Sequence, residues 1–148
     1  MNVTMNNPNT TAPIWFVILA IVLTVWNLIG VMLFLQQMAM TAEQIAALPE
    51  KRQLLLQNIP FWVNIAFGFA VFAGTLGCIA LALKKSIALA FLLISLVGVI
   101  VQMFHAFVLT QSYELYGPGG ALLPLMVIVI ALFLVWLTVN AKLKGWIN

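Results

Sequence analysis

The sequence predicts an all-α membrane protein: a four-transmembrane-helix bundle with a short interfacial helical segment between helices 1 and 2. Two observations predict this class. The chain has 148 residues, of which 65% are hydrophobic and only 6% charged, whereas a soluble domain is about one quarter charged. It also contains four apolar runs of about 20 residues, the length that crosses a hydrocarbon core of roughly 30 Å. Because little chain is left over, we expect residues 1–148 to form a single integral membrane domain.

The expected spans cover residues 13–36, 61–83, 86–110 and 121–140. The first run has no basic region before it and no clear cleavage site after it, and it exceeds the length of a signal-peptide core. We therefore interpret it as a retained transmembrane helix. Pro13 suits the first turn of that helix, where its missing N–H costs nothing.

The connection between the first two spans predicts two short helices lying on the membrane surface. Thr41 and Gln44 have the spacing of a capping box. Pro49 interrupts the segment, and residues 50–57 can begin a second helix that rests apolar side chains on lipid. Two acidic and two basic residues cancel one another here: Glu43, Glu50, Lys51 and Arg52. This balance argues against an anchor for anionic lipid at this connection.

Basic residues predict the orientation of the chain. Lys84 and Lys85 follow the second span, Lys142 and Lys144 follow the fourth, and all four fall on one side if every span is crossed. Lysine and arginine are enriched in cytoplasmic loops. We therefore expect both the N- and the C-terminus in the cytoplasm, with the long first connection and the hairpin at residues 117–120 outside.

A polar stripe marks the third span. Ser95, Gly98, Gln102 and His105 recur at steps of three and four residues, so they share one face of the helix. The rest of that helix is apolar. Since lipid cannot satisfy polar groups, the stripe is expected to face protein.

Polar residues of three spans are expected at similar depths. A rise of 1.5 Å per residue places Asn64 and His105 about 5 and 8 Å below the outer boundary, and Gln102 and Asn27 about 12 and 13 Å below it. Three loop residues lie above them. The predicted ligand-binding set is Asn27, Asn64, Gln102, His105, Tyr113, Glu114 and Tyr116.

Amides and an imidazole in a pocket that opens outward suit a hydroxyl-rich or zwitterionic small molecule better than a bare ion. Alternatives remain open for three of the features. Asn27 can serve as a helix–helix hydrogen bond beside Gly30, His105 can be a satisfied structural histidine, and Gly117–Gly120 can be only a tight turn.

Several classes of activity are not expected. The chain has no paired carboxylates and no serine or cysteine beside a base, so we expect no enzyme. A single histidine does not make a zinc site, and we expect neither metal nor cofactor. The lone Cys78 cannot form an intramolecular disulfide. No basic cluster interleaves with aromatic residues, which argues against nucleic acid. No internal repeat is visible, which argues against an inverted-repeat transporter.

Several motifs resemble a family of small bacterial four-helix inner-membrane proteins that are often labelled sugar transporters. The motifs are TAEQIAALPEKR, GVIVQMFHAF and ELYGPGG, and the resemblance extends from about Trp15 to Trp146. It implies a multi-pass protein of the bacterial inner membrane and favours transport. It assigns no functional residues.

Two functional hypotheses follow. The first is a carrier or binder of a small polar solute, in a homo-oligomer, because four helices rarely enclose a substrate path alone. The alternative is a non-transporting accessory subunit that docks a partner membrane protein through its polar stripe. A carrier needs polar residues along the whole path, whereas this sequence places them only in the outer half.

Overall fold

A computed structural model of the chain describes residues 11–110, 114 and 117–148. Within these ranges the structure is helical and has no strand. The helices run in the order α1 (Ile14–Ala39), α2 (Ala42–Ala46), α3 (Glu50–Gln57), α4 (Phe61–Ala82), α5 (Ala88–Phe104), the π-helical turn η1 (His105–Leu109) and α7 (Leu122–Leu143).

The described residues include four helices that are long and apolar enough to cross a membrane: α1, α4, α5 with η1, and α7. They confirm the predicted all-α, four-helix membrane fold. Each observed span begins and ends within three residues of its predicted limits. The agreement follows from hydropathy, because an unbroken apolar run in lipid must satisfy its backbone internally.

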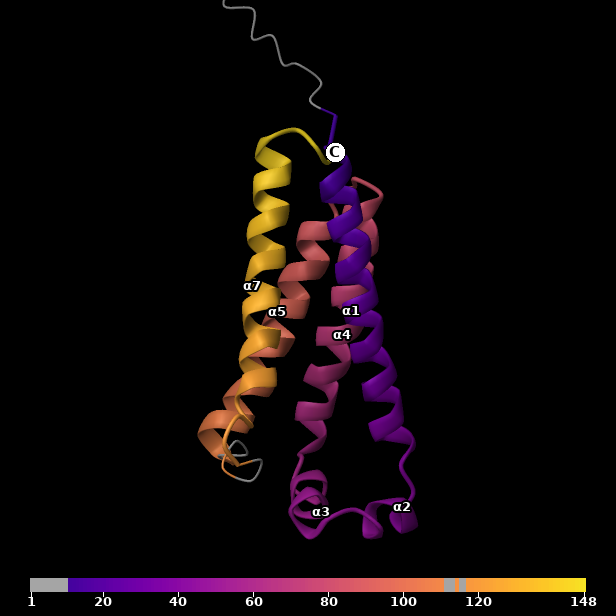
Figure 1. Ribbon diagram of the computed structural model, residues 1–148, viewed down its shortest axis with the longest axis vertical. Helices are drawn as coiled ribbons and strands as arrows, with labels where there is room; N and C mark the ends of the chain where they lie inside the picture. Colours follow the sequence, from indigo (N-terminus) through magenta and orange to yellow (C-terminus); the bar gives the residue numbers. More distant parts are fainter. Residues whose placement is uncertain (1–10, 111–113, 115–116) are drawn as a thin grey trace, which may run out of the picture.

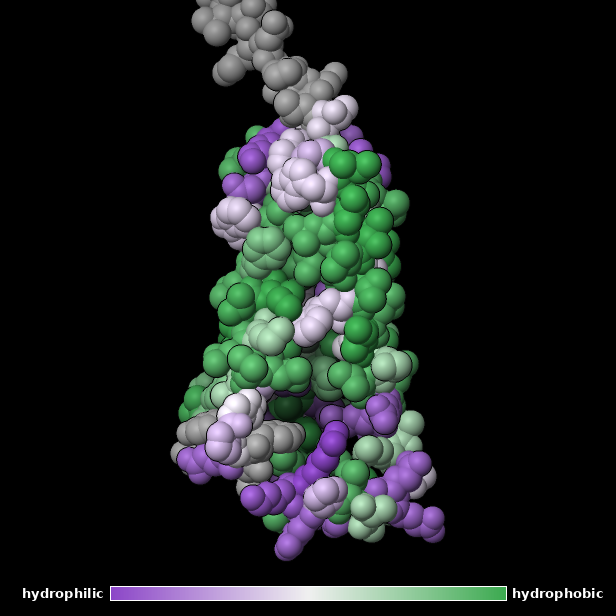
Figure 2. Space-filling view, viewed as in Figure 1, coloured by the Kyte–Doolittle hydropathy of each residue, from purple (hydrophilic) through white to green (hydrophobic). Residues whose placement is uncertain are grey.

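The bundle is arranged around α4, which packs between α1 and α5, while α7 packs on the far side of α5 (Figure 1). α1 and α7 approach each other where α1 begins and diverge towards α2 and α3. We call the end with the α4–α5 turn and residues 144–148 the tail end. The opposite end is called the His105 end. An apolar belt separates the hydrophilic surfaces of the two ends (Figure 2).

The tail end is closed by residues after α7 that the sequence analysis left unassigned. The ring of Trp146 packs edge-on against Phe16, with centroids 5.5 Å apart, and Ile147 is buried. The N–H of Asn148 donates to the carbonyl of Lys84 at 3.0 Å, and the N–H of Ser86 donates to the carbonyl of Asn148 at 2.8 Å. The tail is thereby fixed to the α4–α5 turn.

Both helices that end at the tail end stop in the same way. Lys84 after α4 and Gly145 after α7 have positive φ angles of 59° and 70°. In each case the next N–H, of Lys85 or Trp146, returns to the carbonyl five residues back, at 2.8 and 2.9 Å. This is the Schellman arrangement, which satisfies carbonyls that the helix leaves open.

At Gly98, helix α5 comes into close contact with the backbone of α4. A Cβ atom on Gly98 would lie 2.7 Å from the carbonyl oxygen of Ala66 and 2.9 Å from the amide nitrogen of Ala70. One turn away, the Ser95 hydroxyl donates to the Ala70 carbonyl at 2.6 Å. The first half of the polar stripe therefore serves helix packing, as small residues do in membranes.

The predicted helical segment between the first two spans is also present. Thr41 and Gln44 form the expected capping box at the start of α2. The Gln53 amide donates to carbonyls of Ala46 and Leu48 at 3.0 and 2.7 Å, which ties α3 to α2. That these helices rest on a membrane surface stays a prediction.

We predict that Gly98→Ala destabilises the bundle by about 1–3 kcal/mol, because its methyl group meets the backbone of α4, which cannot move aside. Gly68→Ala is the matched control, since its Cβ meets only the ring of Phe34, at 3.2 Å. Thermal unfolding of the purified protein in detergent measures both variants. Equal melting temperatures for the two would contradict this account of the α4–α5 contact.

Candidate functional site

The side chain of Asn27 joins α1 to α4 in the middle of the bundle. Its amide nitrogen donates to the carbonyl of Leu23 at 2.9 Å and to the sulfur of Cys78 at 3.4 Å. Its oxygen lies so close to Gly74 that any Cβ there would collide with it. One turn on, a Cβ on Gly30 would lie 3.0 Å from Val71. The helix–helix interpretation of Asn27 fits this geometry.

Asn27 does not share a pocket with Asn64. Its neighbour Gly74 lies ten residues after Asn64 on α4, which corresponds to about 15 Å along the helix axis. The expectation of similar depths was therefore wrong for Asn27. The reason is that α1 continues to Ala39 instead of ending at Gln36. Every residue of α1, Asn27 included, therefore lies almost one helical turn further from the end of the helix than expected.

Asn64 has a partner of its own at the His105 end. Its side-chain oxygen accepts a hydrogen bond of 2.9 Å from the Gln37 amide. Gln37 lies just beyond the predicted end of the first span, so sequence reasoning missed it. This pair ties α1 to α4 a second time, near the end where α1 leaves the bundle.

His105 occupies the first position of the π-helical turn η1. Its carbonyl accepts the N–H of Thr110 at 3.0 Å, a spacing of five residues, and such turns are frequent at functional sites. The side chain is 7% exposed. Its ring lies edge-on to Trp62, with centroids 5.4 Å apart and an interplanar angle of 86°.

The imidazole of His105 has no side-chain hydrogen bond within the described residues. The amide of Gln102, one turn earlier and half-buried, has none there either. Imidazole and amide can each donate and accept. We call Trp62, Gln102 and His105 the His105 cluster. It contains two of the predicted site residues and adds Trp62, which the sequence analysis did not connect to His105.

The remaining predicted residues lie in the sequence between η1 and α7. Glu114 is exposed, and Tyr113 and Tyr116 lie outside the described residues. Gly117 and Gly119 have φ angles of 74° and 87° with open space around them. The N–H of Gly120 donates to the carbonyl of Gly117 at 3.0 Å. This geometry is that of a tight turn.

Two grooves on the bundle surface are apolar and do not coincide with the His105 cluster. One, of about 260 Å³, is lined by Ile65, Gly68, Phe69 and Phe72. The other, of about 350 Å³, is lined by Leu122, Leu125, Met126, Val129 and Ile130. Among the described residues no three histidine, cysteine, aspartate or glutamate side chains group as metal ligands.

Comparison with known proteins finds no matching family model, no matching curated protein and no matching solved structure. The resemblance to small bacterial four-helix membrane proteins therefore stays a prediction. Function has to be argued from the His105 cluster itself.

We predict that Asn27→Ala destabilises the bundle by about 1 kcal/mol, because it removes the hydrogen bond from α1 to Cys78 on α4. The control is Thr24→Ala. The Thr24 hydroxyl donates at 2.8 Å only to Ala20 in its own helix, so its removal should change stability by less than about 0.5 kcal/mol. Reversible unfolding in mixed micelles measures both. A larger effect at Thr24 than at Asn27 would refute the interhelical role.

Proposed function

We propose that this multi-pass membrane protein binds a small polar solute at the His105 cluster. The supporting observation is the imidazole of His105, a residue that is only 7% exposed and that makes no side-chain hydrogen bond with the described residues. No buried side-chain nitrogen or oxygen among the described residues lacks a partner, so the ring nitrogens of His105 stay within reach of a solute. A bound hydroxyl or carboxylate would gain a hydrogen bond to this imidazole in surroundings of low polarity, where such a bond is stronger than in water.

The chemistry of the cluster favours a neutral hydroxyl-rich solute or a zwitterion. His105 and Gln102 each offer a donor and an acceptor, and the ring of Trp62 forms an apolar wall beside the imidazole. The only acid nearby in sequence, Glu114, is exposed in the loop. A site with one imidazole, one amide and one indole lacks the carboxylates that a bare cation needs.

Binding is favoured over transport by the contrast between the two ends. At the tail end, Phe16, Leu81 and Trp146 belong to a packed apolar cluster. The stripe residues Ser95 and Gly98 are occupied by contacts with α4. No continuous polar path through the described residues therefore supports a carrier, and transport would need the tail end to open.

The second candidate, an accessory subunit, is supported by the outer helices. α1 and α7 diverge towards the His105 end (Figure 1) and expose most of their apolar side chains. Such faces accept lipid, a second copy of the chain or a partner helix. The first half of the polar stripe, Ser95 and Gly98, is engaged with α4, so we expect a partner to dock on α1 or α7.

For location we propose the bacterial inner membrane with both termini in the cytoplasm. α1 begins and α7 ends at the tail end (Figure 1), which supports placing the start of α1 and the end of α7 on the same side of the bilayer. The four lysines at that end support a cytoplasmic assignment. The His105 cluster would then be reached from outside the cell.

We predict that His105→Leu abolishes solute binding and His105→Gln retains part of it, because glutamine keeps a donor and an acceptor. The probes are glucose and glycine betaine, one hydroxyl-rich and one zwitterionic. The measurement is the rise in melting temperature of the purified protein with each probe. Asn64→Leu is the control, since Asn64 is already paired with Gln37.

The outcomes separate a ligand site from a structural histidine. A binding role requires that His105→Leu loses the probe-induced shift while its own melting temperature stays close to that of the parent protein, since the imidazole makes no hydrogen bond within the described residues. If His105→Leu keeps the shift, or if neither probe stabilises the parent protein, the proposed solute site is wrong.

The orientation is tested by cysteine accessibility in a Cys78→Ala background. We expect Glu50→Cys in α3 to react with an impermeant maleimide in intact cells and Lys85→Cys to react only after permeabilisation. Both positions are exposed, so reactivity reports sidedness and not burial. The reverse pattern would place the termini outside.

A further inference from the structure

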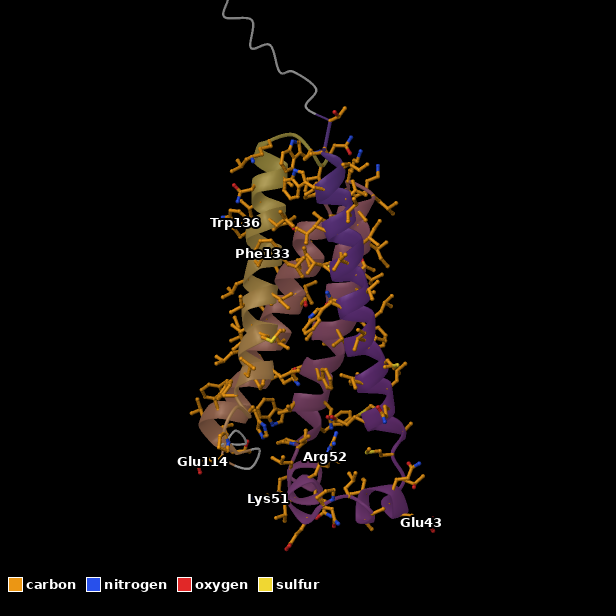
Figure 3. All side chains as sticks on the ribbon, in the orientation of Figure 1. Glu43, Lys51, Arg52, Glu114, Phe133 and Trp136 are labelled. Atoms are coloured by element: carbon orange, nitrogen blue, oxygen red, sulfur yellow. The ribbon has the colours of Figure 1, made fainter. Side chains whose placement is uncertain are left out.

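The charges of the chain are divided unequally between its two ends. All three acidic residues, Glu43, Glu50 and Glu114, lie at the His105 end, where Lys51 and Arg52 also lie (Figure 3). The other four basic residues lie at the tail end: Lys84, Lys85, Lys142 and Lys144. The tail end therefore carries no acidic side chain within the described residues.

The fold joins the two pairs of lysines into one surface. Lys84 and Lys85 follow α4, whereas Lys142 and Lys144 close α7, far away in the sequence. The backbone bonds of Asn148 to Lys84 and Ser86, at 3.0 and 2.8 Å, fix one pair beside the other. All four lysine side chains are exposed. We call this surface the lysine platform.

The lysine platform lies at the level of lipid headgroups. Trp15 in the first turn of α1 is 51% exposed and Trp136 in α7 is 59% exposed, and Trp136 faces outward near the tail end (Figure 3). Exposed tryptophans mark the membrane interface. Leu83 and Leu143, each beside a lysine of the platform, are 65% and 81% exposed, which suits contact with acyl chains below the headgroups.

One lysine is also held in place. The ammonium group of Lys144 lies 4.6 Å from the ring centroid of Trp146, and that ring packs against Phe16. The face of an indole ring attracts a cation. The platform thus contains a positioned charge within a packed end of the bundle, which distinguishes it from lysines on mobile loops.

We propose that the lysine platform binds the headgroups of anionic phospholipids in the leaflet that surrounds the tail end. This inference concerns a site separate from the His105 cluster and does not depend on the proposed solute. Juxtamembrane lysines attract anionic lipid, and the acidic side chains Glu43, Glu50 and Glu114 lie at the opposite end of the bundle. By contrast, Lys51 and Arg52 share α3 and its surroundings with glutamates.

The test measures lipid retention by native mass spectrometry of the full chain, with phosphatidylglycerol and phosphatidylcholine as probes at low ionic strength. The parent protein should retain phosphatidylglycerol more tightly. Lys142→Gln should weaken that retention about fivefold, and Lys84→Gln with Lys85→Gln about 30-fold, since each surface lysine contributes about a factor of five. Phosphatidylcholine should be retained equally by all variants.

Lys51→Gln with Arg52→Gln is the matched control, because it removes two charges from the other end. Equal loss of phosphatidylglycerol in this control would overturn the proposal, since net charge alone would then explain retention. Release of the lipid by millimolar inorganic phosphate would also overturn it in favour of a soluble anion. Lys142→Gln lies on the exposed last turn of α7, so it decides the question even if the double variant at the α4–α5 turn fails to fold.

Discussion

The contact of α5 with the backbone of α4 at Gly98 is the constraint on which the rest of the bundle depends. Lipid chains are as apolar as leucine, so helices in a bilayer gain little by burying such side chains against one another. Close approach and hydrogen bonds have to supply the attraction. Gly98 allows the approach and Ser95 adds the hydrogen bond. With α4 and α5 fixed as a pair, α1 can add to one flank and α7 to the other.

The polar side chains are satisfied to different degrees along this framework. In the middle, Asn27 and Ser95 are engaged with neighbouring helices. Near the His105 end, Asn64 is bonded to Gln37, whereas the imidazole of His105 contacts Trp62 and makes no hydrogen bond within the described residues. The bundle is therefore most completely packed at its tail end and keeps unused hydrogen-bonding capacity at the other.

The spans, the capping box at Thr41 and the shared face of Ser95 and Gly98 could be predicted because each depends on local order: hydropathy, spacing and helical period. The partners of the polar residues could not. A shift of three residues at the end of α1 moved Asn27 away from Asn64. The π-turn at His105 and its contact with Trp62 depend on the packing of α5 against α4. The sequence pattern of either helix alone does not specify this packing.

The packing of Phe16 against Trp146 sets an order for biogenesis. These residues lie near opposite ends of the described chain, so α1 enters the membrane long before its partner beyond α7 has been made. Until then the contacts that can keep α1 beside the growing bundle are those with α4, among them the hydrogen bond from Asn27 to Cys78. This polar contact in the middle of the bundle can therefore form before the aromatic one. The aromatic contact at the tail end closes the structure only once all four spans have been inserted.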